Sequence, residues 1–484
     1  MTARLSFANL PADHRLAMDP HELRVGIVHL GLGAFHRAHQ VVFTEQAGLV
    51  TGETRWAISG VSQRSATVRD QLLPQDGLYS VLSRGRAETT VQVIGSIREV
   101  LCAPEDPAAV VARIADPGVA VVTLTVTEKG YRAAAGGGLD LTDPEIQADL
   151  SGRPPRTVIG QLAAGLAGRV STGAGRLTVV SCDNLVANGP FLRRLVEDYA
   201  AALPVGGSRA DLFEQLAAAR FPASMVDRIV PATTDVDRAE AERLLAVRDE
   251  AVVVAEPFIQ WVIEDDFAGP RPAWEKAGAV LTGDVAPWEQ AKLRMLNATH
   301  SMLAYLGGLR GYDTIAEAVL DDELAGLATE LMTVDVIPTL TPPDGLDLTA
   351  YGASVLERFA NPALRHRTAQ VAMDGSVKLP VRLLGTVRDR LAAGAEPRLV
   401  SLAVAAWMVY VAVGVDAKGR KLPLDDPLAA VLRAAVEFAG SSPAKVVDAL
   451  LGVEAVFGAD LPDRAGFRSM LTEQFKSLLP SVTG

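Results

Sequence analysis

Residues 25–40 read Val-Gly-Ile-Val-His-Leu-Gly-Leu-Gly-Ala-Phe-His-Arg-Ala-His-Gln, and this stretch decides the fold. The first six residues are mostly apolar and predict a buried strand, and the residues after the glycines favour a helix. Gly31 permits a tight turn, and Gly33 lets backbone N–H groups approach a pyrophosphate at the start of that helix. His36 stands where the usual pattern has a third glycine, so the position between first strand and first helix is what favours dinucleotide binding over a plain turn.

The second expected strand, 56–61, is followed by Ser-Gln-Arg-Ser and lacks the acid that normally binds the ribose 2′-hydroxyl. Arg64 is compatible with a 2′-phosphate, so NADP stays open beside NAD, and an acid from elsewhere could fill the role equally well. Glu128 ends the strand expected at 119–126, also at the edge where such sheets bind ligands. The predicted cofactor site comprises Gly31, Gly33, Ala34, Phe35, Ser62, Arg64 and Glu128.

Outward from this motif, apolar β-rich runs alternate with helical patterns as far as about residue 265, which predicts a mostly parallel sheet covered on both faces. Helical periodicity takes over after about residue 285. We therefore expect an α/β domain over residues 1–285 and a mainly α-helical domain over residues 286–484. The expected strands are 25–30, 56–61, 89–97, 119–126, 177–181 and 251–255. The expected helices of the second domain are 288–306, 314–319, 350–359, 381–392, 399–413, 427–438 and 444–451.

The composition is that of an ordinary globular protein of 484 residues, 49% of them hydrophobic and 21% charged. Acidic residues (58) outnumber basic ones (46) and no basic block follows a phosphate backbone, so a nucleic-acid partner is not expected. Cys102 and Cys182 lie far apart, which suggests neither a disulfide framework nor a zinc site and favours a reducing cytoplasm. The N-terminus lacks an apolar signal segment and the longest apolar run, 399–415, is short for a membrane span, so no membrane segment is expected.

A second informative segment is Lys292-Leu-Arg-Met-Leu-Asn297-Ala-Thr-His300. At about 100° per residue in a helix, the lysine, asparagine and histidine side chains fall within an arc of roughly 140° and can face one cavity. They are the groups that a metal-free alcohol oxidation needs: a proton acceptor, a donor for the developing alkoxide and a ligand for a polar substrate. An ordinary surface turn with an incidental histidine is the alternative.

Two further polar clusters follow strand-like runs, where open α/β sheets place their ligands. They are Ser-Cys-Asp-Asn-Leu-Val-Ala-Asn-Gly (181–189) and Val-Asp-Arg-Ile-Val-Pro (226–231). A polar turn explains each of them as well. Asn188 before a glycine suits a left-handed turn, and Asp227 could pair with the arginine after it or cap a turn.

These motifs occur in a recognisable order: Gly-Leu-Gly-Ala-Phe-His-Arg-Ala-His-Gln (31–40), Thr-Val-Thr-Glu-Lys-Gly-Tyr (125–131), Cys-Asp-Asn (182–184) with Asn-Gly (188–189), and Lys-Leu-Arg-Met-Leu-Asn-Ala-Thr-His-Ser (292–301). With them, nearly the whole chain resembles the long-chain mannitol dehydrogenase family of polyol and sugar-acid dehydrogenases. The resemblance includes Trp-Val-Ile-Glu-Asp-Asp-Phe (261–267) and Asp-Gly-Ser-Val-Lys (374–378). It implies a Rossmann-type N-terminal domain, a mainly helical C-terminal domain, an active site in the cleft between them, and no metal.

The resemblance also implies roles for single residues. The family's general base matches Lys292, and the pair of amides that hold the substrate oxygen matches Asn188 and Asn297. Positions that bind substrate hydroxyls or position the sugar chain match His300, Asp227 and Lys378.

The base needs a particular environment. A lysine acts as a base near neutral pH only if burial or positive neighbours lower its pKa from about 10.4 toward 7 to 8, and a cleft that excludes water would do this. Glu289 lies one helical turn before Lys292 and could either relay the proton to solvent or only pair with the lysine.

Within the family, residues 361–380 resemble the fructuronate reductase branch more than the mannitol 2-dehydrogenases, because Gln370 stands where polyol oxidisers usually carry arginine. Ala369 departs from the bulky aromatic residue that the uronate enzymes tend to have. A substrate carboxylate needs a cationic site, which Lys378, Arg367 or Arg228 could supply, although a solvated helix face explains Arg367 equally well. The resemblance implies reduction of the C5 ketone of D-fructuronate to D-mannonate with NADH.

Other functions stay open. The substrate could instead be mannitol, arabinitol, sorbitol or a tagaturonate-type sugar acid. A regulator that binds a nucleotide and a sugar acid without turnover would not need Lys292 beside two amides, and a β-hydroxyacid dehydrogenase normally keeps the third glycine that His36 replaces. We expect a small sugar acid or polyol as the partner and a monomer or small homo-oligomer as the state of the chain.

Overall fold

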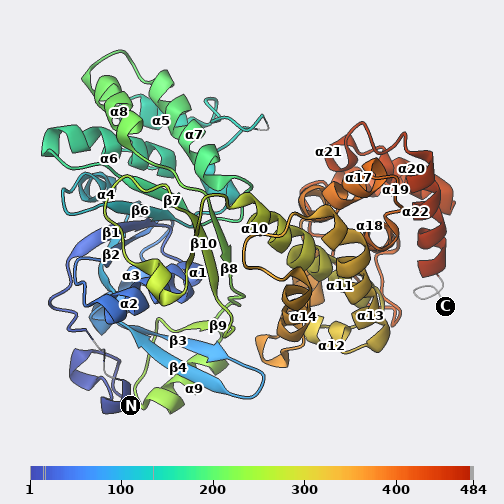
Figure 1. Ribbon diagram of the computed structural model, residues 1–484, viewed down its shortest axis with the longest axis horizontal. Coiled ribbons are helices and arrows are strands. Elements are labelled where there is room, and N and C mark those ends of the chain that lie inside the picture. Colours follow the sequence, from blue (N-terminus) through green and yellow to red (C-terminus); the bar gives the residue numbers. More distant parts are fainter. Residues whose placement is uncertain (1, 15, 17, 135, 480–484) are drawn as a thin grey trace. The chain divides into compact units, whose positions relative to one another are not determined.

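The protein is described here by a computed structural model, which covers residues 2–14, 16, 18–134 and 136–479. The chain divides into two compact units, Met1–Ala286 and Pro287–Gly484. Strands and helices alternate in the first unit, drawn from blue to yellow-green in Figure 1, and the second unit is built from helices. The expected order of an α/β domain followed by a mainly helical domain is confirmed.

The first unit is organised around a parallel five-stranded sheet with the order β5-β2-β1-β6-β7. Ile27 and Val28, neighbours in its central strand, enter different hydrophobic cores because successive side chains of a strand point to opposite faces. Helices cover both faces (Figure 1). The strands of this sheet are β1 (Val25–Leu30), β2 (Ala57–Ser62), β5 (Ile97–Cys102), β6 (Val121–Leu124) and β7 (Thr178–Ser181).

Two three-stranded sheets complete the unit, with the orders β11-β10-β8 and β4-β3-β9. The single strand predicted over 89–97 is wrong, because Gly95 and Ser96 separate β4 from β5 and these strands belong to different sheets. The buried carboxylate of Glu45 fixes this bend by accepting hydrogen bonds from the Gly95 N–H (3.2 Å) and the Ser96 hydroxyl. The strands are β3 (Tyr79–Arg84), β4 (Thr89–Ile94), β8 (Ser224–Asp227), β9 (Val253–Ala255), β10 (Gln260–Glu264) and β11 (Val280–Thr282).

Side-chain caps begin several helices of this unit. The Asp106 side chain accepts from the N–H of Ala109 at the start of α4, and Thr157 accepts from that of Gly160 at the start of α6. The α-helices are α1 (Ala34–Ala38), α2 (Gln40–Thr51), α3 (Thr67–Leu72), α4 (Pro107–Ile114), α5 (Pro144–Leu150), α6 (Val158–Thr172), α7 (Asn188–Ala202), α8 (Gly207–Ala218) and α9 (Asp235–Leu245). The 3₁₀ turns are η1 (Phe7–Asn9), η2 (Ala12–His14), η3 (Leu73–Gln75), η4 (Glu128–Tyr131) and η5 (Trp274–Ala277).

The second unit packs around α11 and α18, which are buried along most of their length and share one hydrophobic core. Of the described helices, none is long and apolar enough to cross a membrane. The α-helices are α10 (Ala286–Ala291), α11 (Ala298–Leu309), α12 (Ile315–Val319), α13 (Asp322–Glu330), α14 (Leu348–Phe359), α15 (Thr368–Ala372), α16 (Gly375–Leu379), α17 (Gly385–Ala392), α18 (Arg398–Val413), α19 (Ala429–Ala439), α20 (Pro443–Leu451), α21 (Glu454–Phe457) and α22 (Ala465–Leu478).

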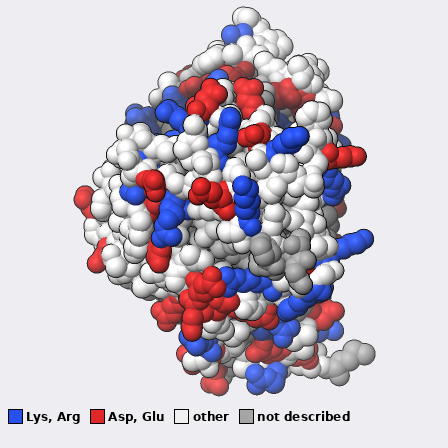
Figure 2. All heavy atoms as spheres, turned by 90° about the vertical axis from the view of Figure 1, so that its right-hand side faces the viewer, with Lys and Arg blue, Asp and Glu red and all other residues white. Residues whose placement is uncertain are grey.

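Shorter helical turns link these helices. The 3₁₀ turns are η8 (Ile337–Thr339) and η9 (Pro362–Leu364), and the π-helical turns are η6 (Lys292–Asn297), η7 (Leu331–Val336) and η10 (Pro380–Leu384). Basic and acidic side chains are intermingled on the face of the molecule in Figure 2.

Candidate functional site

The turn between β1 and α1 has the geometry that its glycines suggest. Gly31 has a φ of +100°, and a Cβ added there would lie 2.1 Å from the carbonyl oxygen of Thr125, so the fold itself requires glycine. Gly33 is different, because a Cβ added there would meet no described atom closer than the Gly31 carbonyl oxygen at 3.7 Å. The space above Gly33 is therefore open.

The histidine in place of the third glycine is part of a buried stack. His36 lies against His29 with the ring centroids 3.2 Å apart and the planes within 6°. The ring nitrogens of His29 contact the hydroxyl oxygens of Thr123 (2.7 Å) and Thr125 (2.8 Å), which ties β1 to β6 below the turn. Burial lowers the pKa of His29 to about 3 and that of His36 well below its usual value, so both rings are neutral at physiological pH.

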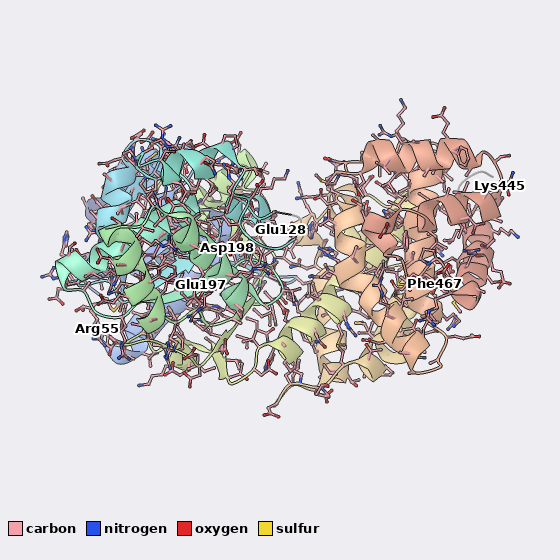
Figure 3. The ribbon with its side chains drawn as sticks, turned by 90° about the horizontal axis from the view of Figure 1, so that it is seen from above. Arg55, Glu128, Glu197, Asp198, Lys445 and Phe467 are labelled. Atoms are coloured by element: carbon pink, nitrogen blue, oxygen red, sulfur yellow. The ribbon has the colours of Figure 1, made fainter. Side chains whose placement is uncertain are left out.

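A cavity of about 580 Å³ opens at the carboxyl ends of β1, β2 and β6. Of the predicted cofactor residues, Gly31, Gly33, Ser62 and Arg64 line it. The other three lie outside the lining: Ala34 and Phe35 continue into α1, where Phe35 stacks on His39, and Glu128 is exposed on η4 (Figure 3). The lining also contains Leu32, Gln63, Ser65, Val68, Thr125, Val126, Thr127, Lys129, Gly130, Arg132, Arg156, Thr157 and Val158.

The loop after β6 borders this cavity in a strained conformation. Thr127 has a φ of +66°, which is unfavourable for a β-branched residue. The Asp183 carboxylate holds the loop by accepting hydrogen bonds from the N–H groups of Val126 (2.9 Å) and Thr127 (3.0 Å) and from the Tyr131 hydroxyl (2.7 Å). Burial raises the pKa of the Asp183 carboxyl, although the hydrogen bonds it accepts act in the opposite sense. Asp183 thus positions the loop from within the protein.

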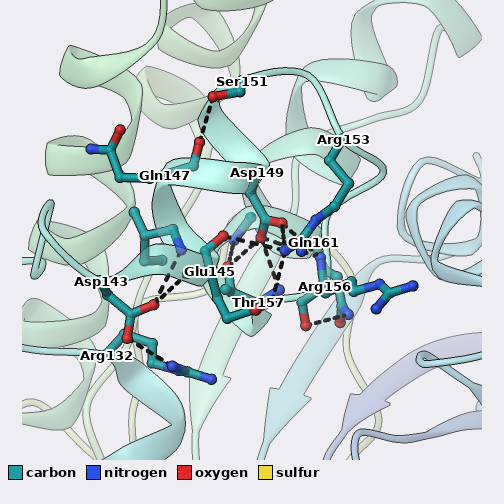
Figure 4. A network of polar contacts seen from close by, with 12 residues as sticks. Arg132, Asp143, Glu145, Gln147, Asp149, Ser151, Arg153, Arg156, Thr157 and Gln161 are labelled. Carbon is teal, nitrogen blue, oxygen red and sulfur yellow. Dashed lines mark hydrogen bonds and ion pairs between the residues drawn. The ribbon is translucent and has the colours of Figure 1, made fainter.

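A second buried carboxylate, that of Asp149, holds the segment at Arg156 and Thr157, which also lines the cavity (Figure 4). Asp149 accepts hydrogen bonds from the backbone N–H of Arg156 (3.1 Å) and from the N–H (2.9 Å) and hydroxyl (2.7 Å) of Thr157. Arg153 completes this network with an ion pair to Asp149 at 2.7 Å. The Arg156 side chain extends away from the network (Figure 4), so the backbone is fixed while the guanidinium stays exposed.

The predicted alkoxide ligand Asn188 is buried at the start of α7 and joins β7 to β8. Its Nδ2 donates to the carbonyl oxygens of Asp183 (3.0 Å) and Ser224 (2.8 Å), and its Oδ1 accepts from the Ser224 N–H (2.9 Å). A substrate oxygen would have to share one of these donors. The left-handed residue is Ala187 (φ +49°), and Gly189 is needed because an added Cβ would lie 2.3 Å from the Phe221 carbonyl oxygen.

Asp227 is buried at the end of β8, paired in register with Gln260 of β10. The guanidinium of Arg228 donates to the carbonyl oxygens of Glu256 (2.9 Å) and Ala38 and to the Ser83 hydroxyl (3.1 Å). These contacts place Arg228 within the packing of the first unit, which does not favour it as a ligand of a substrate carboxylate.

The segment with the predicted base is a π-helical turn inside a longer helix, whereas the sequence predicted one regular helix over 288–306. Lys292 is 6% exposed and begins η6, and Asn297 ends it. The Ala298 N–H reaches back five residues to the Leu293 carbonyl, as a π-turn requires. Residues five apart then lie about one turn apart, so Lys292 and Asn297 share a face that an α-helix would have split by about 140°. Glu289 lies in α10, one turn before the lysine.

His300 lies three residues further, on the first turn of α11, in cationic surroundings. Its ring stacks on Phe359 (4.6 Å, 21°) and meets His366 edge-on at 4.7 Å. Burial lowers the pKa of His300 well below its usual value, and the electrostatic interactions with His366, Arg382, Lys378 and Arg358 act in the same direction. Among the described residues, its Nε2 has no hydrogen-bond partner.

Lys378 and Arg367 occupy different surroundings in the second unit. Lys378 Nζ donates to the carbonyl oxygens of Val371 (3.3 Å) and Met373 (2.5 Å) at the end of α15. Arg367 lines a separate cavity of about 590 Å³ together with Ala369, Arg420, Lys421 and Arg433. Gln370 is exposed.

Residues 25–276 match the sequence-family model of the mannitol dehydrogenase Rossmann domain, and residues 284–479 match that of the mannitol dehydrogenase C-terminal domain. The chain belongs to the mannitol dehydrogenase family. It is 42% identical to the D-mannonate oxidoreductase of Escherichia coli strain K12 over 483 residues, 97% of this chain and 96% of the relative.

Solved structures of this family share the fold over the full length. Pseudomonas fluorescens mannitol 2-dehydrogenase, in a ternary complex with NAD and D-mannitol, matches with a TM-score of 0.86 at 36% identity, covering 99% of this chain and 97% of that one. A D-sorbitol dehydrogenase in substrate-free form matches with a TM-score of 0.88 at 32% identity, covering 100% and 99%. The family suggested by the motifs is confirmed.

In this member of the mannitol dehydrogenase family, several residues beside the predicted ones were missed from the sequence. Arg358 and Arg382 lie on elements remote in sequence from His300, and no local pattern marks them. Lys129 and Arg156 line the first cavity from two different loops. One local pattern could have indicated Arg156. Thr157 is the N-cap of α6, so the residue before it lies next to the start of that helix.

Proposed function

We propose that the protein is an NAD(H)-dependent oxidoreductase that reduces the C5 ketone of D-fructuronate to D-mannonate. The observation that supports this substrate is the cationic environment of His300. Arg358, Lys378 and Arg382 act on the charge of that ring, and the same positive charges favour a substrate that carries a carboxylate over an uncharged polyol. The 42% identity to a D-mannonate oxidoreductase points in the same direction.

The first unit supports the proposed cofactor. A cavity of about 580 Å³ at the carboxyl ends of three parallel strands is where open α/β sheets bind nucleotides. The room beside Gly33 lets a pyrophosphate approach the backbone closely. When bound, a reduced nicotinamide dinucleotide supplies the hydride, that is, both electrons of the reduction.

In the proposed reaction, Lys292 acts as the general acid. As the ketone carbon takes up hydride, its oxygen gains negative charge and receives the proton from the Lys292 ammonium group. The Asn297 amide stabilises that oxygen by donating a hydrogen bond, and Asn188 is the proposed second donor. Solvent then returns a proton to Lys292, with Glu289 as the proposed relay. Oxidation of the alcohol follows the same steps in reverse.

An assay of NADH consumption with fructuronate, tagaturonate and fructose in parallel tests the substrate. We expect kcat/KM for fructuronate to exceed that for fructose by about a hundredfold, because a desolvated charge pair contributes about 3 kcal/mol. Equal turnover of fructose and fructuronate would show that the carboxylate is not recognised.

The base is tested in the same assay. Lys292→Ala should lower kcat by about a thousandfold, since proton transfer then depends on water. Lys445→Ala, which removes an exposed lysine of the second unit (Figure 3), is the matched control and should keep the wild-type rate. A wild-type rate for Lys292→Ala would exclude this lysine as the acid.

Mannitol oxidation is the second candidate, because a mannitol 2-dehydrogenase shares the fold at a TM-score of 0.86. Adding mannitol, arabinitol and sorbitol with NAD to the assay distinguishes it, and turnover of mannitol alone would assign this function. Binding of NADH and fructuronate without turnover of any of these substrates would instead favour a sensor.

A further inference from the structure

The cavity of the first unit has an unusual charge for a site that binds a nucleoside. Among the described residues that line it, four are cationic and none is acidic. One of the four, Arg132, is already paired with Asp143 at 2.7 Å (Figure 4). The remaining cations are Arg64, Lys129 and Arg156, all exposed, and no hydrogen bond or ion pair occupies their charged groups within the described part of the chain.

Arg64 has the position that matters most, two residues after the end of β2. In nucleotide-binding sheets of this type the end of the second strand lies beside the ribose 2′ position of the adenosine. Its neighbour in α3, Arg69, is held by Glu105 and by Asp70 (3.0 Å). Those two carboxylates are therefore engaged by Arg69, and the Arg64 guanidinium keeps its charge available for a ligand.

The residue at the end of β2 differs from what an NAD-selective site needs. Such a site uses a carboxylate that accepts the hydrogen of the 2′-hydroxyl and repels a phosphate there. Here Ser62 occupies that place, 5% exposed, and among the described residues its Oγ has no hydrogen-bond partner. A serine hydroxyl can donate to a phosphate oxygen, and the planar guanidinium fork of Arg64 can bind two more.

We infer that this cavity accepts a 2′-phosphorylated nicotinamide dinucleotide, with Arg64 and Ser62 as the ligands of the 2′-phosphate. The inference rests on the proposed dinucleotide site and extends it to the NADP class. A 2′-phosphate carries a charge near −2 at neutral pH, and Lys129 and Arg156 add to the positive potential along the same cavity. The protein should therefore bind NADPH as well as NADH.

Two nucleotide fragments isolate the effect of the phosphate. Calorimetric titration of the full-length protein with 5′-AMP and with adenosine 2′,5′-bisphosphate compares ligands that differ only at the 2′ position. We expect the bisphosphate to bind about tenfold more tightly, and we expect this preference to weaken at high salt. Fluorescence titrations with NADH and NADPH should give dissociation constants within about tenfold of each other.

Two variants and one control assign the preference to named residues. Arg64→Ala should abolish the preference for the bisphosphate and leave AMP binding within about threefold of wild type. Ser62→Asp introduces the carboxylate that this position lacks. This variant should also abolish the preference for the bisphosphate, and it should keep NADH binding. Arg176→Ala removes an exposed arginine of the first unit that does not line the cavity, and it should keep the wild-type preference.

The outcomes separate this inference from the proposed function. Tighter binding of AMP than of the bisphosphate by the wild-type protein, together with ordinary NADH binding, overturns the inference and leaves the dinucleotide site intact. A preference that survives in both variants overturns the assignment to Arg64 and Ser62. Failure of the wild-type protein to bind either dinucleotide overturns the inference and the proposed function together.

Discussion

Two asparagines with the same proposed role have different structural surroundings. The amide of Asn188 makes three hydrogen bonds that join β7 to β8. The side chain of Asn297 lies half-buried at the end of η6 and makes no hydrogen bond in the described part of the chain. Removal of each amide should therefore affect stability and activity in different proportions.

Asn188→Ala should lower the free energy of unfolding by about 2 to 4 kcal/mol, because it removes the partner of both the carbonyl oxygen and the N–H of the buried residue Ser224. Asn297→Ala should lower it by less than about 1 kcal/mol yet reduce kcat by about a hundredfold. Urea unfolding and steady-state kinetics on both variants check this. An Asn188→Ala protein as stable as wild type would show that these hydrogen bonds contribute little.

The stacked histidines make stability depend on pH. The pKa of His29 is about 3 in the folded protein and about 6.5 in the unfolded chain, so below pH 6.5 only the unfolded chain takes up the proton. The contribution of His29 is complete above pH 6.5 and is lost as the pH falls, by about 1.4 kcal/mol for each pH unit. His36 acts in the same direction.

Unfolding free energies of wild type and His29→Gln at pH 7.5 and 5.5 measure this contribution. The decrease between the two pH values should be about 1.4 kcal/mol smaller in the variant. Identical decreases would mean that His29 is protonated as readily in the folded protein as in the unfolded chain.

The loop that follows β6 shows how a strained element is kept in place. Asp183→Asn should lower the free energy of unfolding by about 2 to 3 kcal/mol, because the N–H groups of Val126 and Thr127 donate to different oxygens of the carboxylate. An amide accepts with one oxygen only, so its NH₂ group would face one of these two N–H groups. The same variant should weaken NADH binding, because the loop lines the cavity.

Glu197→Gln provides the control for this charge change. Glu197 forms an exposed i,i+4 ion pair with Arg193 on α7, so its loss should cost no more than about 0.5 kcal/mol (Figure 3). Urea unfolding of both variants measures the difference. An Asp183→Asn protein as stable as Glu197→Gln would mean that the loop keeps its conformation without the hydrogen bonds to the Asp183 carboxylate.

At the level of elements, the sequence predicts what is local and misses what depends on tertiary structure. The central strands at 25–30 and 57–62 were found because four or more apolar residues between turn signals are a local pattern. The split of 89–97 depends on a carboxylate from α2, and periodicity cannot show it. The π-turn of η6 was missed for the same reason, because its residues are good α-helix formers and only packing decides how the turn closes.

The candidate site likewise contains some residues that local sequence patterns predict and others that only the tertiary structure brings together. The turn glycines and Ser62 and Arg64 were found because their places relative to strand ends follow from the fold pattern. The cationic neighbours of His300 come from α14, α16 and η10, which the sequence alone does not bring together. Arg367, predicted to bind the substrate, lines a cavity of the second unit beside the loop that follows α18, and its role stays a prediction.

For the molecule as a whole, each unit has hydrophobic cores of its own residues, and only the first unit carries the proposed dinucleotide cavity. Saturating NADH should therefore slow hydrogen–deuterium exchange in peptides that span 31–33, 62–65 and 125–132, because ligand binding disfavours local opening. Exchange in α18, a core helix of the second unit, should show no change that arises from direct contact with the dinucleotide.

Gly33→Ala is the matched variant for this experiment. Its added Cβ has room in the protein, so the fold should be kept, while the methyl group occupies the space that the pyrophosphate needs. Exchange in the variant should be the same with and without NADH. Protection equal to that of wild type would place the dinucleotide elsewhere.

The π-turn between Lys292 and Asn297 also offers a criterion for sorting relatives. Its one additional residue per turn keeps the amine and the amide on one face, so the number of residues between them matters as much as their identity. A homologue with both residue types at the same spacing, but with this segment closed as a regular α-helix, would keep its helix and hold the two groups about 140° apart. Such a change, invisible to a comparison that scores residue identities alone, would separate the proposed acid from the proposed alkoxide ligand in a chain that has retained the fold.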